Sequence, residues 1–178
     1  ERPFGDIDTD RLEAWRFGDH AEENAEELAA ITTAGAYVMG RNMFGPDRGE
    51  WDLDWRGWWG PNPPYHAPTF VLAHRPRPSL EMEGGTVFHF VTDGIESALE
   101  QARSAAGGRD VALGGGADVA NQYLAAGLID EMELHVVPIL LGGGERLFEG
   151  VGTDLHGLEL VRTVAGDGVV HLKLARRA

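Results

Sequence analysis

The sequence predicts an α/β domain with a mostly parallel sheet and a C-terminal antiparallel hairpin. Short apolar runs alternate with segments of helical periodicity over most of the 178 residues. Near the C-terminus, two apolar segments flank Gly166-Asp167-Gly168, a tripeptide typical of a hairpin turn. A chain of this length can bury a substantial core, so we expect a single domain over residues 1–178.

The individual elements follow from periodicity and from the glycines and prolines that bound it. After a loop over residues 1–8, Asp19 and Glu22 form a capping-box pattern that predicts a helix over residues 20–33. The expected apolar face of that helix carries Ala21, Ala25, Leu28, Ala29 and Thr32. We expect Asp93 to cap a second long helix. Strands are expected at 36–40, 69–73, 86–91, 110–113, 132–141, 158–164 and 169–175.

Composition narrows the classes of function. The formal net charge of −14 disfavours nucleic acid and anionic membrane surfaces as partners, and no apolar run approaches the ~20 residues of a membrane helix. The absence of cysteine excludes disulfides and thiolate chemistry and agrees with a cytoplasmic location. The histidines show no metal-ligand spacing, so we expect no metal site. We expect His135 to be a hydrogen-bonded core residue and His171 to lie on a solvated strand face.

Three predicted strands end in residues suited to an anionic ligand. Gly114, Gly115 and Gly116 separate a strand from a helix, which predicts either a phosphate cradle at the helix N-terminus or a tight turn without a ligand. The G-x-G-x-x-G fingerprint is not satisfied, because Val119 stands at its third glycine. Arg41 follows another strand and could pair with phosphate or balance nearby acids on the surface.

Another strand is followed by a histidine and an arginine. His74 and Arg75 could bind a 2′-phosphate or belong to a solvated loop. The long segment 45–68 is rich in tryptophan and predicts a stacking wall for a planar ligand, a subunit contact or a small satellite core. Reactive side chains are few, a profile that suits an enzyme whose cofactor supplies the chemistry.

Several stretches resemble the dihydrofolate reductase-like superfamily, in the branch of the C-terminal reductase domain of the bifunctional riboflavin-biosynthesis deaminase/reductase. They are YVMGRNMF at 37–44, FVLAHRP at 70–76, FVTDGIESALEQA at 90–102 and GGGADVANQYLAAGLIDEMELHVVPILLGGGERLF at 114–148. The resemblance implies a three-layer sandwich of the dihydrofolate reductase type. It also implies that the first strand of the family precedes Glu1.

The resemblance further implies that the three strand ends hold NADPH. The implied cofactor-binding residues are Gly40, Arg41, Asn42, Ala73, His74, Arg75, Gly115, Gly116, Ala117, Asp118 and Val119. Trp15, Phe44 and Trp59 are candidates for an apolar substrate wall. Gly114 stands where riboflavin-pathway reductases usually carry a substrate-contacting glutamate, which weakens the assignment of their substrate to this chain.

The resulting hypothesis is an NADPH-dependent reductase that transfers hydride to a pterin-like or pyrimidine-like heterocycle, acting as a homodimer. The alternative is a nucleotide-binding module of the same fold without turnover. The missing glutamate and the lack of an identifiable proton donor favour the alternative.

Overall fold

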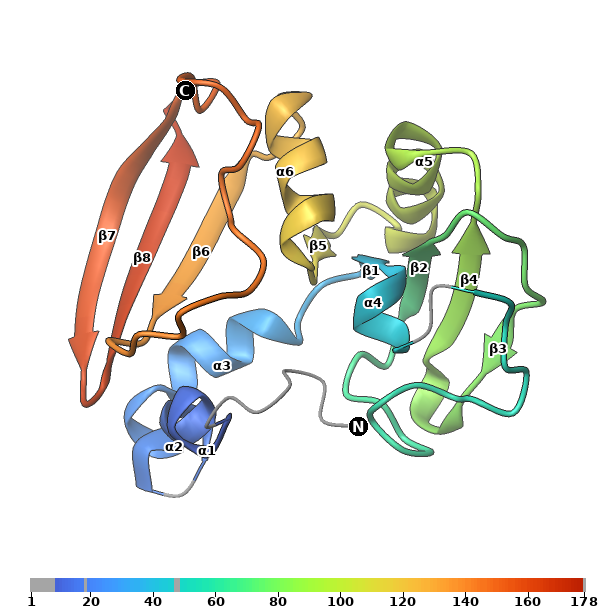
Figure 1. Cartoon of the computed structure of the whole chain (residues 1–178), viewed down its shortest axis with the longest axis horizontal. Coiled ribbons are helices and arrows are strands. Elements are labelled where there is room, and N and C mark those ends of the chain that lie inside the picture. The colour runs from blue at the N-terminus through green and yellow to red at the C-terminus, as the bar shows by residue number, and fades with distance from the viewer. Residues whose placement is uncertain (1–8, 18, 47–48, 178) are drawn as a thin grey trace. The chain divides into compact units, whose positions relative to one another are not determined.

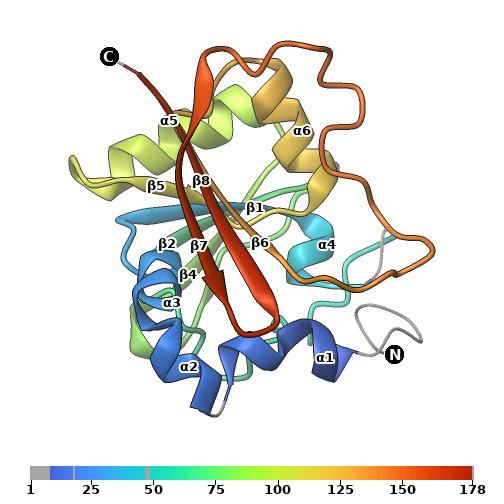
Figure 2. The same ribbon diagram turned by 90° about the vertical axis from the view of Figure 1, so that its left-hand side faces the viewer.

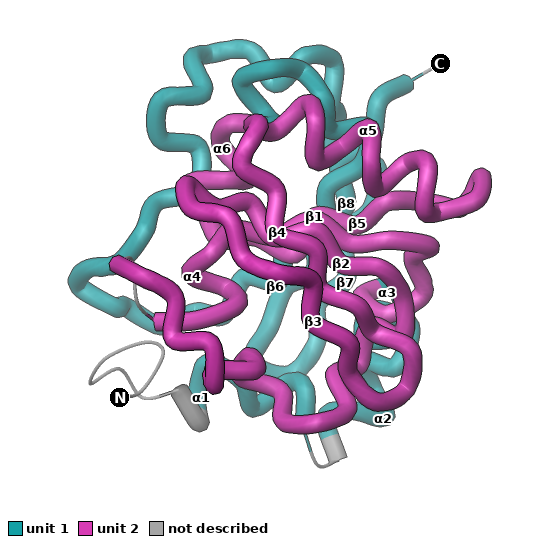
Figure 3. The backbone as a smooth tube through the Cα atoms, turned by 90° about the vertical axis from the view of Figure 1, so that its right-hand side faces the viewer, with its two compact units in different colours: residues 1–30, 123–178 teal, residues 31–122 magenta. Residues whose placement is uncertain are grey.

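The computed structural model describes residues 9–17, 19–46 and 49–177, and the predicted loop at 1–8 lies outside these ranges (Figure 1). The chain divides into two compact units, one of residues 31–122 and one of residues 1–30 and 123–178 (Figure 3). The association of both units into a single domain stays a prediction.

The unit of residues 31–122 is a five-stranded sheet with helices. Its order is β3-β4-β2-β1-β5, with β1, β2, β4 and β5 parallel and β3 antiparallel at one edge. The elements are β1 (Ala36–Gly40), α4 (Arg41–Phe44), β2 (Pro68–Leu72), β3 (Leu80–Glu81), a 3₁₀ turn (Glu83–Gly85), β4 (Val87–Val91), α5 (Ile95–Ala106) and β5 (Val111–Leu113). The predicted mostly parallel sheet is confirmed, and α5 packs on β1, β2 and β5.

A core rich in aromatic residues packs on β1, β2 and β4 of this unit. Met39, Phe44, Val71, Met82 and Phe88 form a buried cluster. Trp51, Trp55 and Trp59 of the long segment pack against that cluster. The tryptophan-rich segment therefore packs into a core, as one interpretation predicted, but this core is that of the sheet and not a small satellite of it.

The other unit is built on a separate antiparallel sheet. Its order is β6-β8-β7, and the long β7–β8 hairpin turns at Asp167 and Gly168 as predicted (Figure 2). Leu124, Val151 and Leu158 form its buried apolar cluster. Its elements are α1 (Thr9–Glu13), a 3₁₀ turn (Ala14–Arg16), α2 (Asp19–Glu23), α3 (Ala25–Ile31), β6 (Glu131–Val136), β7 (Leu158–Gly166) and β8 (Val169–Arg176). Helix α6 (Ala117–Ala125) runs from one unit into the other.

The first long helix differs from its prediction. It is two short helices, α2 and α3, that meet at Asn24. The expected apolar face is wrong, because Ala25 and Ala29 are exposed whereas Asn24 and Glu27 are buried. Polar partners on the second sheet make this burial possible, as described below.

Three further expectations are corrected. The strand expected at 132–141 ends at Val136, since Pro138 has no N–H to continue a ladder. Gly94, at φ 93°, is the N-cap of α5 and makes no side-chain hydrogen bond, so Asp93 is not the cap. His171 is buried, with 4% of its surface exposed, and does not lie on a solvated face.

Candidate functional site

The parallel strands bring the three predicted strand ends to one edge of the sheet. β1 lies between β2 and β5, with Gly40 opposite Leu72 and Val38 opposite Leu113. The segments that begin at Arg41, Ala73 and Gly114 therefore leave the sheet side by side. In open α/β sheets this carboxyl edge is where ligands bind.

Gly40 and Gly115 join two of these segments through the backbone. The N–H of Gly40 donates to the carbonyl oxygen of Gly115 at 2.7 Å, and the N–H of Gly114 donates to the carbonyl oxygen of Val38 at 2.8 Å. A Cβ at Gly40 would lie 2.8 Å from Cγ2 of Val119, so only glycine allows this approach. Gly115 has φ +94°, a conformation that favours glycine, and its peptide bond to Gly116 is cis.

Helix α6 begins directly after this junction. The N–H groups of Ala117, Asp118 and Val119 belong to its first turn, where no intrahelical acceptor is available. They form the positive end of the helix dipole, which suits a phosphate. Asp118 places an exposed carboxylate in the same turn, and this carboxylate accepts a hydrogen bond from Gln122 Nε2 at 3.0 Å. The junction therefore fits a phosphate-bearing cofactor, with Asp118 as an opposing charge.

The two arginines of the site contact one dipeptide. The guanidinium carbon of Arg41 lies 3.7 Å from the ring centroid of Trp51, and Arg41 Nη2 donates to the carbonyl oxygen of Glu50 at 3.5 Å. Arg75 forms an ion pair with the Glu50 carboxylate. The carbonyl oxygen of Arg75 accepts a hydrogen bond from Trp51 Nε1 at 3.0 Å. Asn42 and His74 are exposed at the same edge, and Ala73 is half-buried.

The candidate substrate residues are distributed differently. Phe44 has no exposed surface and belongs to the aromatic core. Trp59 is half-buried and stacks on Phe88, with ring centroids 5.9 Å apart. Gly114 is exposed, and a Cβ there would meet nothing closer than 3.8 Å, so the backbone has room for a side chain. Trp15 belongs to the other unit.

In that other unit, Asn24 begins a directional chain of hydrogen bonds. Its Nδ2 donates to the carbonyl oxygens of Trp15 at 3.2 Å and His20 at 2.7 Å, which fixes the orientation of the amide. Asn24 Oδ1 then lies 2.7 Å from Nε2 of His171, so that nitrogen must carry a proton.

The histidine tautomers follow from this orientation. His135 and His171 are cross-strand partners, and their Nδ1 atoms lie 2.7 Å apart. In a neutral His171 that donates from Nε2, Nδ1 is the acceptor, so His135 Nδ1 is the donor. The indole of Trp15 covers both rings, at centroid distances of 4.6 and 5.2 Å. Burial lowers the pKa of His135 below its ordinary 6.5, and the neighbouring His171 lowers that pKa further.

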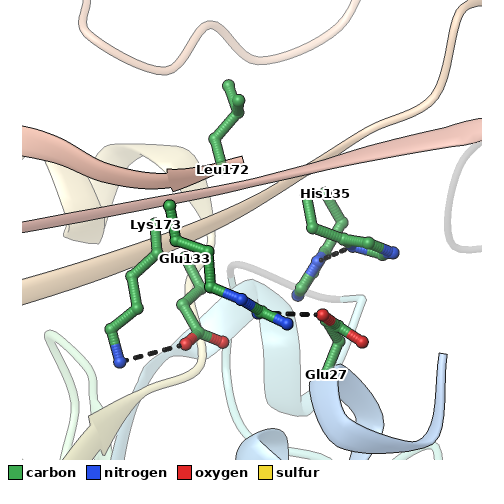
Figure 4. A pocket seen from close by; sticks show the side chains of 7 residues that line it. Glu27, Glu133, His135, Leu172 and Lys173 are labelled. Atoms are coloured by element: carbon green, nitrogen blue, oxygen red, sulfur yellow. Dashed lines mark hydrogen bonds and ion pairs between the residues drawn. The ribbon is translucent and has the colours of Figure 1, made fainter. Parts of the chain in front are cut away.

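Charged side chains from α3, β6, β7 and β8 lie beside the histidine pair (Figure 4). Arg162 on β7 pairs with Glu27 at 2.9 Å and Glu26 at 3.1 Å. Burial raises the pKa of Glu27, but the hydrogen bond from its own backbone N–H and Arg162 outweigh burial and bring it below 4.5. The hydrogen bond to Glu131 raises the pKa of Lys173, which pairs with Glu131 at 2.7 Å and Glu133 at 3.4 Å.

Sequence reasoning missed this polar cluster. One signal was available, because β6 and β8 each carry a histidine that alternates with apolar residues. No signal marked Asn24 or Glu27. Within the described ranges, no group of three or more histidine, aspartate or glutamate side chains could hold a metal ion. In the same part of the chain, no helix is long and apolar enough to cross a membrane.

Comparisons with known proteins agree with the fold. A Shewanella sp. PV-4 protein assigned to riboflavin biosynthesis matches with TM-score 0.65 and 22% identity, over 95% of this chain and 88% of that one. Acinetobacter baumannii RibD matches with TM-score 0.54 and 19% identity, over 92% of this chain and 52% of the other. Dihydrofolate reductase from Enterococcus faecalis, in a complex with NADP(H), matches with TM-score 0.55 and 18% identity, over 88% and 83%. These likenesses confirm the dihydrofolate reductase-like fold.

A comparison with curated protein sequences gives no significant match. The family model of the RibD C-terminal domain matches residues 5–172, nearly the whole chain. The predicted branch of the superfamily is thereby confirmed, and the chain belongs to the RibD C-terminal domain family.

Proposed function

We propose that this chain is an NADPH-dependent reductase that transfers hydride to a pterin-like or pyrimidine-like heterocycle. Membership of the RibD C-terminal domain family supports a reductase-type function. A fold neighbour from Thermotoga maritima is named a deaminase and 5-amino-6-(5-phosphoribosylamino)uracil reductase. The observation that carries the proposal is the close approach of Gly40, Gly115 and Val119 at the start of α6.

The chain's own residues would hold the cofactor along the carboxyl edge of the sheet. Gly115, Gly116 and Ala117, with Asp118 and Val119, would present backbone N–H groups to the pyrophosphate. Gly40, Arg41 and Asn42 would bind phosphate from the end of β1. Ala73, His74 and Arg75 would lie at the adenosine 2′-phosphate. The bound cofactor supplies a hydride, and the protein orients both reactants and excludes water.

One observation favours nucleotide binding without turnover. Gly114 is exposed and has no side chain at the position where the resemblance places a substrate-contacting glutamate. If that glutamate is needed to bind substrate, the intact cradle would still bind a nucleotide.

We further propose a cytoplasmic homodimer. Val136, Leu140 and Leu141 expose apolar side chains at and beyond the end of β6, and burying such a surface would stabilise a dimer. The charge of −14 disfavours nucleic acid and anionic membranes as partners. Light scattering coupled to gel filtration tests the dimer, and a single mass of one chain at micromolar concentration would contradict it.

Titration with NADPH tests the proposed function. Binding is followed by calorimetry, and oxidation at 340 nm is followed with a panel of pterins and aminopyrimidines. Arg41→Ala should weaken NADPH by about 1–3 kcal/mol, or roughly 5- to 150-fold, because a charge-assisted phosphate contact is lost. Arg103→Ala on the exposed face of α5 is the matched control and should change nothing.

The outcomes separate the two functions. Failure of the wild-type chain to bind millimolar NADPH or NADH would contradict both. Binding without oxidation across the panel would support the nucleotide-binding module. Equal affinity of wild type and Arg41→Ala would remove Arg41 from the site.

A further inference from the structure

Both arginines of the proposed cofactor site, Arg41 and Arg75, contact the dipeptide Glu50-Trp51. Arg41 lies over the Trp51 indole and donates to the Glu50 carbonyl oxygen. Arg75 pairs with the Glu50 carboxylate and accepts from Trp51 Nε1 through its own carbonyl oxygen. The dipeptide therefore presents an aromatic ring to one guanidinium and an anion to the other.

These two groups have the chemistry of one end of NADPH. A planar, electron-rich ring stacks on a guanidinium as an adenine does, and a carboxylate takes the ion pair that a phosphate would take. Neither contact depends on the other unit of the chain, because all four residues lie within 31–122.

We infer that Glu50 competes with the 2′-phosphate of NADPH for Arg75 and so sets the preference between NADPH and NADH. This inference rests on the proposed cofactor site. A carboxylate can accept a hydrogen bond from the ribose 2′-hydroxyl of NADH but repels a 2′-phosphate. NADPH must displace Glu50 from Arg75 in order to pair with it, whereas NADH can leave the ion pair in place.

The exposure of the pair makes this competition effective. The side chains of Glu50 and Arg75 are 82% and 52% exposed, so the ion pair is screened by solvent and can be exchanged. The 2′-phosphate therefore gains Arg75 only at the expense of an existing anion.

The experiment measures binding and needs no turnover. Calorimetry on the full chain gives the dissociation constants of NADPH and NADH, and of 2′,5′-ADP and 5′-AMP as fragments, for wild type, Glu50→Gln and Arg75→Gln. Glu100→Gln on α5 is the control, with the same change of charge at another exposed site.

Glu50→Gln should tighten NADPH and 2′,5′-ADP by about 3- to 10-fold, because both the competing ion pair and the repulsion are removed. NADH and 5′-AMP should change by less than about twofold, because they carry no 2′-phosphate for Glu50 to repel. In the Arg75→Gln background the same substitution should act far less on NADPH, since the contested partner is gone.

Two results would overturn the inference. If Glu50→Gln shifts NADPH and NADH equally, or no more than Glu100→Gln does, the competition does not exist although the proposed cofactor site stands. If no nucleotide binds to any variant, the proposed cofactor site fails and the inference fails with it.

Discussion

Replacing Asn24 by leucine should destabilise the chain by removing the centre of a buried hydrogen-bond chain. Asn24 is 2% exposed, and its side chain bonds to the carbonyl oxygens of Trp15 and His20 and to His171 Nε2. Each is worth about 1 kcal/mol net, and a buried donor left without an acceptor costs about 1–3 kcal/mol. The apolar volume of leucine offsets part of the loss, so we expect about 2–4 kcal/mol.

Urea unfolding followed by far-UV circular dichroism measures this change at pH 7.5. A loss of about 3 kcal/mol corresponds to a fall in Tm of roughly 6–12 °C in a chain of this size. Gln101→Leu is the control, because its amide is exposed on α5 and donates to Ser97 Oγ alone among the described side chains. The control should stay within about 0.5 kcal/mol of wild type.

A double-mutant cycle tests the cause of the loss. In Asn24→Leu His171→Leu the orphaned donor is gone, so the double variant should cost about 1–2 kcal/mol less than the sum of the single variants. A single Asn24→Leu variant as stable as wild type, or strict additivity in the cycle, would refute the proposed hydrogen-bond chain.

Three further predictions concern protonation and the cradle. The pKa of His135 is lowered in the folded chain, so the unfolded chain takes up a proton first and the free energy of unfolding should fall as pH drops below 6.5. The pKa of Glu27 is also lowered in the folded chain, so protonation of this carboxylate should lower the free energy of unfolding a second time below pH 4.5. Urea midpoints from pH 8 to 4 measure both losses. His135→Gln should remove only the first, and a flat profile between pH 7 and 5 would contradict it. Gly40→Ala should cost about 1–3 kcal/mol of stability because its Cβ meets Val119, and Gly40→Ala Val119→Ala should recover part of this by the same urea assay. Asp118→Asn should tighten NADPH by about 2- to 5-fold in calorimetry because a carboxylate leaves the first turn of α6, and unchanged affinity would place the pyrophosphate elsewhere.

The parallel sheet was predictable because its constraints are local. A strand buried on both faces is a continuous apolar run, and glycine or polar residues mark its ends. The strand expected at 36–40 is β1 with the same bounds, and β2 and β4 differ from prediction by one residue. The hairpin was predictable for a similar reason, since Asp167-Gly168 supplies the positive φ that its turn needs.

The polar interior of the other unit was not predictable from local pattern. Apolar periodicity predicts that Ala25 and Ala29 are buried, but the buried residues are Asn24 and Glu27. Their burial is compensated by partners far along the chain, since the hydrogen-bonded Asn24 and His171 are 147 positions apart in the sequence. Which face of a helix is buried depends on the surface against which the helix packs, and no residue near Asn24 in the sequence indicates that surface.

The same contrast between local pattern and distant partners applies to the proposed cofactor site, where the class of cofactor and the preference between NADPH and NADH depend on different features. The cradle rests on backbone geometry at Gly40 and Gly115, where a side chain would close the approach or strain the turn, so the glycines themselves mark it. The proposed discrimination between a 2′-hydroxyl and a 2′-phosphate would rest on an exposed ion pair between Glu50 and Arg75, from segments with no periodic pattern. Changing Glu50 costs little stability, because an exposed ion pair contributes at most about 1 kcal/mol. Preference at such a site can therefore change by one substitution while the cradle stays the same, so the cradle's glycines predict that a dinucleotide binds but not which one.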